Sequence, residues 1–284
     1  GEVYIISPAA LKDVSVQEFN DTYKGGEYDI RTSIQASAAT VADRDKESIQ
    51  WTFTVEGEKK TELTDAGTYT VSYTVSADNH LSQSGSVTFT IKQAELTLKA
   101  NNVSVVYGTE AGAIEWHEGL NGVTVLSGLV GKDVGKEAEV FAGITFTYSA
   151  VNYSAGDGVG GKYGVRITNA FDLTNYTVTT QDGVLTVTPL AITVEIDYQS
   201  GTYGMTAENM AAQVKSHLRE GSALYSKDTE SKVWSLSVLT ADNAGASPVS
   251  GTPNAGRYYI YGKAESNNYS ITFCGQEAEG GAYG

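Results

Sequence analysis

Residues 67–75 read Gly-Thr-Tyr-Thr-Val-Ser-Tyr-Thr-Val, and this stretch decides the fold. Every second position from Tyr69 to Val75 carries a large apolar or aromatic side chain, and the positions between them carry threonine or serine. A period of two with one apolar face indicates a β-strand that packs one face on a core and turns the other to water. The same alternation recurs at 49–55, 144–148 and 269–273. Sheets of this kind pack face to face, so the sequence predicts an all-β sandwich fold.

The composition also favours strands over helices. The 284 residues include 31 glycines and 4 prolines, and threonine, serine, valine and tyrosine recur throughout. β-branched and aromatic residues suit a pleated, half-buried surface, and glycine suits tight turns. A chain of this length is too long for one ordinary sandwich and long enough for two or three domains, each with its own core.

Short motifs recur along the chain at intervals of about 95 residues, which indicates one structural unit copied several times. Gly67-Thr68-Tyr69 matches Gly161-Lys162-Tyr163 and Gly256-Arg257-Tyr258, and Tyr107-Gly108 matches Tyr203-Gly204. Each Gly-x-Tyr motif is followed by an asparagine-containing turn, at 78–80, 174–176 and 267–269.

The repeat predicts three tandem immunoglobulin-like β-sandwich modules, at residues 1–93, 94–188 and 189–284. At both boundaries a closing strand runs into the next opening strand without a Gly/Ser-rich linker. Connections this short predict an elongated array and a monomeric rod. The third module has no clear closing strand after Cys274, so we expect it to be truncated or to end in a degenerate strand.

One stretch of the third module breaks the strand pattern. Apolar residues recur there at helical spacing, at Ala207, Met210, Ala211, Val214 and Leu218. Thr206 is suited to cap such a helix and Gly221 to end it. We therefore predict a helical insertion near 206–220, with His217 on it. The helix either covers an open end of the sandwich or docks a partner.

An ordered set of motifs runs through the second module: Val105-Val106-Tyr107-Gly108, residues 126–133, Gly161-Lys162-Tyr163-Gly164-Val165, Asn175-Tyr176-Thr177-Val178 and Gly183-Val184-Leu185-Thr186-Val187. Together they resemble the YGX-type MBG module of bacterial surface proteins. The third module keeps three of the motifs, and the first shares only the later half of the pattern and looks like a more general bacterial Ig-like domain. The resemblance implies a repeat from long, secreted or wall-attached proteins, often described as adhesin-like, with no catalytic residues and no cofactor.

The net charge, the hydrophobic runs and the cysteine content exclude several kinds of partner and cross-link. The formal net charge of −15 opposes phosphate backbones and anionic lipids, so we expect no nucleic acid partner. No apolar run approaches the length that spans a bilayer, so we expect no membrane insertion by this segment. Cys274 is the only cysteine, which excludes an intrachain disulfide.

Few residues indicate chemistry. His80, His117 and His217 lie in no triad motif, and Cys274 has no basic or histidine neighbour in sequence, so we expect no catalytic residue. The carboxylates of Asp133 and Asp157 are candidates for a loop Ca²⁺ site.

Aromatic residues on outer faces are candidates for ligand binding, because such rings stack on sugars. Trp51 and Trp234 alternate in phase with apolar neighbours, which predicts that both are core residues. Three aromatic residues are left as candidate ligand-binding positions, namely Trp116, Tyr259 and Tyr261.

These observations, together with the resemblance, give two functional hypotheses. The first is a non-enzymatic segment of a secreted or cell-surface bacterial protein, acting as an adhesin-like stalk, spacer or presentation module. The alternative is a carbohydrate- or protein-binding module that recognises a host or environmental glycan or protein, including one accessory to a polysaccharide-degrading enzyme. Either hypothesis places the segment outside the cell.

Overall fold

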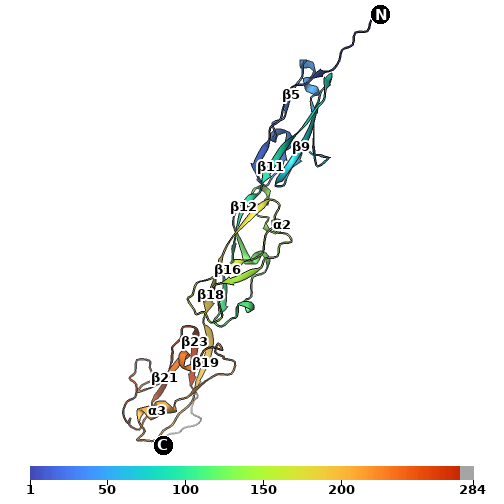
Figure 1. Ribbon diagram of the computed structural model, residues 1–284. Coiled ribbons are helices and arrows are strands. Elements are labelled where there is room, and N and C mark those ends of the chain that lie inside the picture. The colour runs from blue at the N-terminus through green and yellow to red at the C-terminus, as the bar shows by residue number, and fades with distance from the viewer. Residues whose placement is uncertain (276–284) are drawn as a thin grey trace. The chain divides into compact units, whose positions relative to one another are not determined.

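The computed structural model describes residues 1–275, which form an all-β chain with a few short helices (Figure 1). The chain divides into two compact units. The first unit comprises Gly1–Ala100, His117–Tyr148 and Ile167–Gln181, and the second comprises Asn101–Trp116, Ser149–Arg166 and the residues from Asp182 onward. The all-β prediction is confirmed. The division into three modules stays a prediction.

The first unit contains most of the strands. They are β1 (Ala9–Ala10), β2 (Lys12–Ser15), β3 (Phe19–Thr22), β4 (Tyr28–Asp29), β5 (Ser37–Ala39), β6 (Gln50–Val55), β7 (Glu58–Lys59), β8 (Glu62–Leu63), β9 (Gly67–Ser76), β10 (His80–Leu81), β11 (Gln83–Lys92), β12 (Ala94–Ala100), β14 (Val123–Ser127) and β17 (Tyr176–Gln181). Its helical turns are α1 (Ile30–Ser33), α2 (Glu137–Val140) and the 3-10 turns Asp43–Ser48, Gly119–Gly122 and Gly131–Asp133.

A five-stranded sheet in the order β3-β11-β9-β6-β7 is the largest in the first unit. The long strands β9 and β11 are antiparallel, and β3 joins the far edge of β11 in parallel. Every second side chain of β9 faces the interior, where Val71 and Val75 are fully buried, and Phe89 of β11 is fully buried beside them. The alternation predicted for 67–75 is therefore confirmed, whereas the strand predicted at 144–148 was wrong, because strand begins there only at Tyr148. Trp51 of β6 is half-buried and stacks on Phe53.

The second sheet of the first unit has the order β14-β12-β17, with β12 parallel to β17. The register places Ala94 opposite Tyr176. The short pair β1-β10 repeats this parallel arrangement, with Ala9 opposite His80. Each of these opening strands begins beside an Asn-containing turn, because Asn79 and Asn175 directly precede the two partner residues.

The remaining elements lie in the second unit, either completely or for most of their residues. They are β13 (Val103–Val106), β15 (Tyr148–Val151), β16 (Tyr163–Ile167), β18 (Gly183–Thr188), β19 (Leu190–Ile196), β20 (Ser216–Leu218), β21 (Trp234–Leu239), β22 (Tyr259–Ala264), β23 (Tyr269–Gly275), α3 (Ala207–Gln213), α4 (Glu230–Val233) and the 3-10 turn Ala111–Ala113.

Up to Gly275, the second unit contains the sheets β13-β18-β16-β15, β20-β19-β23 and the two-stranded β21-β22. In the first of them, β18 lies between β13, to which it is parallel, and β16, to which it is antiparallel. Leu185 and Val187 of β18 point into the core. Trp234 of β21 is buried as predicted, and its indole N–H donates to Ser216 Oγ at 3.1 Å.

The predicted helix is present but only half as long as expected. It begins at Ala207, and the Thr206 side chain accepts from the Asn209 amide at 3.3 Å, as predicted for the N-cap. It ends at Gln213 instead of continuing to 220, so the prediction that Gly221 ends the helix was wrong. Residues 216–218 form β20 instead, because their backbone pairs with β19. The sequence predicted that His217 lies on this helix, but the structure places it on the strand β20.

Strands follow one another closely at the two predicted boundaries. β11 ends at Lys92 and β12 begins at Ala94, while β18 ends at Thr188 and β19 begins at Leu190. The expectation that the third module is truncated or ends in a degenerate strand concerns the residues after Gly275, which lie outside the described residues. Among residues 1–275, no helix has the length and apolar character needed to cross a bilayer.

Candidate functional site

The most distinctive polar arrangement of the first unit is a cluster of Tyr23, Asp133 and Tyr176. Both tyrosine hydroxyls donate to the same carboxylate oxygen, Asp133 Oδ2, at 2.8 Å from Tyr23 and 2.7 Å from Tyr176. The two rings meet edge to face with centroids 5.5 Å apart. Both tyrosines are buried, so this is a largely desolvated set of charge-assisted hydrogen bonds.

The backbone around this cluster fits closely. The Lys132 amide donates to the Gly25 carbonyl at 3.0 Å. A Cβ placed on Gly25 would lie 2.0 Å from the Val130 oxygen, and Gly25 also has a φ of +70°. Glycine is therefore required at this position by both space and backbone conformation. The Val130 amide in turn donates to the Tyr176 hydroxyl at 3.3 Å.

Asn175, next to Tyr176, adds a second contact beside the cluster. Its side-chain oxygen accepts from the Ala66 amide at 2.7 Å, and its side-chain nitrogen donates to Asp65 at 3.1 Å. The contact joins two of the motifs found in the sequence: Ala66 directly precedes the first Gly-x-Tyr motif, and Asn175 belongs to the second Asn turn.

The second unit contains the same cluster, built from Tyr107, Asp228 and Tyr269. The hydroxyls of Tyr107 and Tyr269 donate to Asp228 Oδ2 at 2.9 and 2.6 Å. Their rings are 5.4 Å apart and edge to face. The Tyr225 amide donates to the Tyr269 hydroxyl at 3.0 Å, as Val130 does to Tyr176 in the first unit.

The flanking asparagine contact is also repeated. Asn268 precedes Tyr269, and its side-chain oxygen accepts from the Val159 amide at 2.9 Å. Gly108 follows Tyr107 with a φ of +89°, and a Cβ there would lie 3.2 Å from the Tyr225 ring. Two clusters with the same hydroxyl, carboxylate and amide contacts are thus present, one in each unit.

Burial and the shared carboxylate keep the tyrosine protons in place. Burial first, and then the hydrogen bond to the aspartate, raises the pKa of Tyr107 and of Tyr176 to about 12. The same causes raise the pKa of Tyr23 and of Tyr269 further. These hydroxyls therefore stay protonated donors at neutral pH, and the clusters act as fixed polar cross-links.

Sequence reasoning found both tyrosines of the second cluster but only Tyr176 of the first, since Tyr23 was not identified. The Tyr-Gly motif at 107 and the Asn-Tyr turns at 175 and 268 were identified as repeated positions, but their shared acceptor was not. Asp133 was identified only as a candidate calcium ligand. A signal was present, since Lys132-Asp133 and Lys227-Asp228 recur at the repeat spacing, but only the fold brings each aspartate to its tyrosines.

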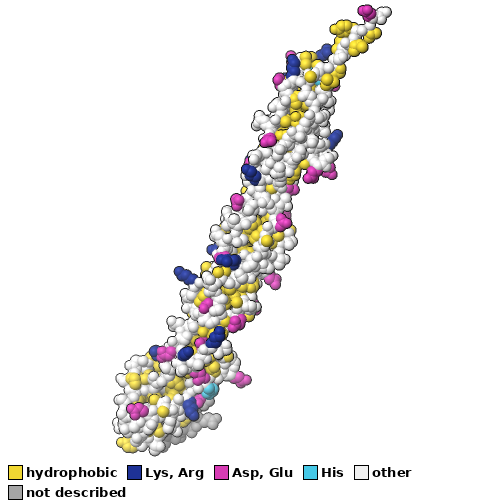
Figure 2. Space-filling view, in the orientation of Figure 1, with side chains coloured by type: hydrophobic (Ala, Val, Ile, Leu, Met, Phe, Trp, Pro, Cys, Tyr) yellow, Lys and Arg dark blue, Asp and Glu magenta, His cyan; other side chains and the backbone are white. Residues whose placement is uncertain are grey.

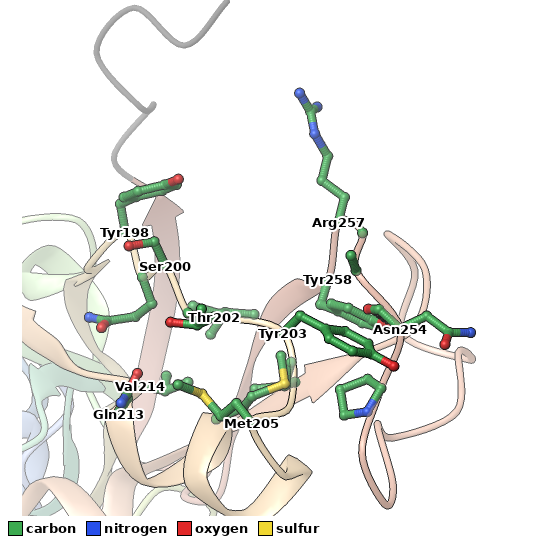
Figure 3. A pocket seen from close by; sticks show the side chains of 18 residues that line it. Tyr198, Ser200, Thr202, Tyr203, Met205, Gln213, Val214, Asn254, Arg257 and Tyr258 are labelled. Carbon is green, nitrogen blue, oxygen red and sulfur yellow. Dashed lines mark hydrogen bonds between the residues drawn. The ribbon is translucent and has the colours of Figure 1, made fainter. Parts of the chain in front are cut away.

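A cavity of about 440 Å³ lies in the second unit between α3, β22 and the segment 198–205. Figure 3 shows Tyr198, Ser200 and Val214 on one side of it and Asn254 and Tyr258 on the other, with Thr202 and Met205 between them. Met210, Val238 and Ile260 add apolar surface to the lining. The side chain of Tyr203 is 75% exposed.

The structure places the three predicted ligand-binding residues on two different segments. Tyr259 and Tyr261 lie on β22, half-buried and exposed respectively, whereas Tyr258 and Ile260 line the cavity. The two pairs thus face opposite ways, as the strand alternation predicts. Trp116 is half-buried in the loop after the turn Ala111–Ala113. Binding of a sugar by these residues stays a prediction, checked by glycan binding of Trp116→Ala and Tyr259→Ala.

The other residues considered for chemistry are placed as follows. Asp157 accepts from the Ser154 amide at 2.7 Å, and residues 1–275 contain no group of three or more His, Cys, Asp or Glu side chains arranged for a metal ion. His217 lies between Glu195 and Asp197, at 3.2 and 3.0 Å.

His80 occupies the position in β10 that Tyr176 occupies in β17. The Val41 amide donates to His80 Nε2 at 2.9 Å, as the Val130 amide donates to the Tyr176 hydroxyl. Cys274 is half-buried in β23, with its Sγ 3.7 Å from the Val194 carbonyl oxygen.

No known protein family and no curated protein matches the chain. Among solved structures, the chain is remotely similar to the Bacillus anthracis TIE protein, at 9% identity and a TM-score of 0.26, over 94% of this chain and 57% of that one. It is also remotely similar to the Bacteroides ovatus mixed-linkage glucan utilization locus protein SGBP-B in complex with a mixed-linkage heptasaccharide, at 13% identity, 95% and 69% coverage and a TM-score of 0.23. Extracellular domains 3–5 of Drosophila OTK give 10% identity, 96% and 100% coverage and a TM-score of 0.23. The chain thus spans little more than half the length of the Bacillus protein chain.

Proposed function

We propose that the chain is a non-enzymatic segment of a secreted or cell-surface bacterial protein, in which three tandem immunoglobulin-like modules act as an adhesin-like stalk or presentation spacer. The observation that carries this proposal is the repeated Tyr-Asp-Tyr cluster. With boundaries near residues 93 and 188, Tyr23 belongs to the first module, and its partners Asp133 and Tyr176 belong to the second.

The second cluster supports the same interpretation one module further along. Tyr107 belongs to the second module, and Asp228 and Tyr269 belong to the third. The first and second modules therefore each offer a tyrosine, Tyr23 or Tyr107, to the next module, which contributes the aspartate and the Asn-Tyr pair. A spacer positions what it carries only when bending between its modules is restrained, and buried, charge-assisted hydrogen bonds at each junction supply that restraint.

The proposed restraint on bending between the first and second modules can be tested by measuring the distribution of distances between two dyes, one on each module. Dyes on Lys59→Cys and Ala138→Cys, in a Cys274→Ser background, place one label on each of the first two modules at exposed positions. We expect a narrow single-molecule energy-transfer distribution, which broadens when Asp133→Ala is added. Asp182→Ala removes an exposed carboxylate bonded to Arg166 and serves as the control. Equal widths with and without Asp133 would count against a spacer role for the cluster.

The surface location has a separate test. Antibodies raised against the chain should label intact cells of the bacterium that makes it, without permeabilisation. Labelling that appears only after the cells are opened would contradict the proposal, whatever the stiffness of the junctions.

A further inference from the structure

Both Tyr-Asp-Tyr clusters bring two phenol groups together at one base. Charged side chains are scattered over the face of the molecule in Figure 2, whereas Asp133 is half-buried and accepts from Tyr23 and Tyr176 through the single oxygen Oδ2. Two hydroxyls that donate to one oxygen must lie close to each other, so the hydroxyl ends of the two rings are their near ends. The cluster around Asp228 repeats this arrangement.

The two rings of each cluster are also in contact. Their centroids are 5.5 Å apart for Tyr23 and Tyr176 and 5.4 Å apart for Tyr107 and Tyr269, edge to face in both. At this separation, carbon atoms on the edge of one ring lie in van der Waals contact with the other ring, about 3.5–4 Å away. Carbon atoms next to the two hydroxyls are therefore placed where a bond between the rings can form once one ring tilts.

Oxidation of a buried tyrosine needs a base at its hydroxyl. A phenol that loses an electron becomes strongly acidic, so in a buried site the electron leaves only when the proton leaves with it. A base takes up such a proton when it lies within about 2.6–3.2 Å of the donor oxygen. The hydroxyl–carboxylate distances in the two clusters are 2.8, 2.7, 2.9 and 2.6 Å. Because each aspartate is half-buried and not enclosed, it can pass the first proton to water before it accepts the second.

Another tyrosine pair in the second unit has the ring contact without the shared base. Tyr153 and Tyr163 meet edge to face with centroids 5.4 Å apart. Their hydroxyls donate to two separate backbone carbonyls, of Thr109 at 2.6 Å and of Gly158 at 3.2 Å. An amide carbonyl is a far weaker base than a carboxylate. This pair therefore separates the effect of ring contact from the effect of the proton acceptor.

We propose that the two clusters are sites of oxidative tyrosine cross-linking, in which the shared aspartate accepts the protons and a carbon–carbon bond joins the paired rings. Each tyrosine gives one proton to the aspartate and one electron to an external one-electron oxidant, such as the oxidised haem of a peroxidase that hydrogen peroxide regenerates. The two phenoxyl radicals join at carbons next to their oxygens. The hydrogen on each of these carbons then moves as a proton to the oxygen of the same ring, which restores both phenols. The product has lost two electrons and two protons, and nothing else leaves.

A cross-link of this kind would make each cluster a permanent connection, because thiol reductants do not cleave a carbon–carbon bond. Its consequence for the molecule rests on the proposed function: if the clusters join modules, oxidation fixes the spacer in its restrained form. Formation of the bond needs only the cluster geometry. Failure of the cross-link would therefore leave the spacer proposal standing, and failure of the spacer proposal would leave the chemistry unaffected.

Photo-oxidation of the full chain tests the chemistry. Tris(bipyridine)ruthenium(III), generated by light and persulfate, removes single electrons, and a dilute solution keeps bonds between copies rare. The monomer fraction is digested, and mass spectrometry identifies linked peptides by the loss of two hydrogen atoms. We expect Tyr23–Tyr176 and Tyr107–Tyr269 products, and at least about tenfold less of a Tyr153–Tyr163 product. Absence of either cluster product, or a Tyr153–Tyr163 yield equal to theirs, would overturn the proposal.

Asparagine substitutions isolate the role of the carboxylate. Asp133→Asn keeps the size of the side chain and an oxygen that accepts hydrogen bonds, but it takes up no proton. We expect it to lower the product of its own cluster at least about tenfold and to leave the product of the other cluster unchanged, whereas Asp228→Asn should do the reverse. Nuclear Overhauser contacts between the two rings verify that they still touch in each variant. An unchanged yield from the altered cluster would show that the aspartate is not the proton acceptor.

Discussion

At the scale of single residues, the described part of the chain repeats one arrangement of buried tyrosines around a half-buried carboxylate. Each copy has one carboxylate that accepts two buried tyrosine hydroxyls, so removing the carboxylate leaves two donors without their acceptor. Unpaired buried donors cost more than the hydrogen bonds contribute when they are made. Both aspartates are therefore expected to be sensitive to substitution.

Asp133→Ala should lower the free energy of unfolding of the first unit by about 2–4 kcal/mol, because two hydrogen bonds to a charged acceptor are lost from a largely buried site. Urea denaturation followed by far-UV circular dichroism measures the change. Asp182→Ala, which breaks an exposed ion pair with Arg166, should cost about 1 kcal/mol or less. A cost for Asp133→Ala as small as that of the control would show that the cluster contributes little to stability.

The free energy of unfolding should also fall at alkaline pH, because folding raises the pKa of the cluster tyrosines. The pKa of Tyr107 and Tyr176 is raised from 10.0 to about 12 in the folded chain. Below pH 10 both folded and unfolded tyrosines are protonated, and the stabilising effect is complete. Above pH 10 the unfolded chain releases protons that the folded chain keeps, so the free energy of unfolding falls as pH rises towards 12.

Thermal unfolding midpoints measured from pH 9 to pH 12 should show this decline. The variant carrying both Tyr107→Phe and Tyr176→Phe keeps the rings but has two fewer titrating hydroxyls, so its decline should be shallower. Parallel curves for the variant and the wild type would contradict the proposed role of these two hydroxyls.

At the scale of strands and helices, most of the pattern was predictable because it depends on neighbours in sequence. The alternation in β6 and β9 identifies the buried face directly, and Thr206 identifies the start of α3. The end of α3 was not predictable in this way. Residues 214–218 continue the helical spacing, but pairing with β19 satisfies the backbone of residues 216–218 and makes them a strand. A contact with a distant strand thus overrode the local pattern.

The interior strand β11, which lies between β3 and β9, should be among the elements least tolerant of truncated side chains. Phe89 is fully buried and packs against the rings of Phe19 and Tyr28, so Phe89→Ala should cost about 3–5 kcal/mol of unfolding free energy. Thr88 is adjacent but exposed, and Thr88→Ala should change stability by about 0.5 kcal/mol or less. Chemical denaturation of both variants compares the two faces of one strand, and similar losses would argue against the assigned register.

At the scale of the whole molecule, the same cluster occurs once in each compact unit, and the two clusters share no residue. The long-range partners could not be read from sequence, because Tyr23 and Asp133 are 110 positions apart and Tyr107 and Asp228 are 121 apart. The repeat spacing identified Tyr107, Tyr176 and Tyr269 but not Tyr23, and the choice of acceptor depends on the three-dimensional arrangement of loops.

Because the clusters share no residue, damage to one should remain local. In hydrogen-exchange mass spectrometry, Asp133→Ala should increase exchange in peptides around Tyr23 and Tyr176 and leave those around Tyr107 and Tyr269 unchanged, whereas Asp228→Ala should do the reverse. Increased exchange at both clusters in either variant would show that the two units unfold together.

The paired tyrosines and aspartates also determine how such a chain would respond to pulling. Each cluster is closed by hydrogen bonds, without any sulfur–sulfur bond, so thiol reductants have nothing there to cleave. A link of this kind opens under tension and closes again when the tension is released, with no oxidant or enzyme needed to restore it. The chain would therefore recover its original length after repeated stretching, in both reducing and oxidising surroundings.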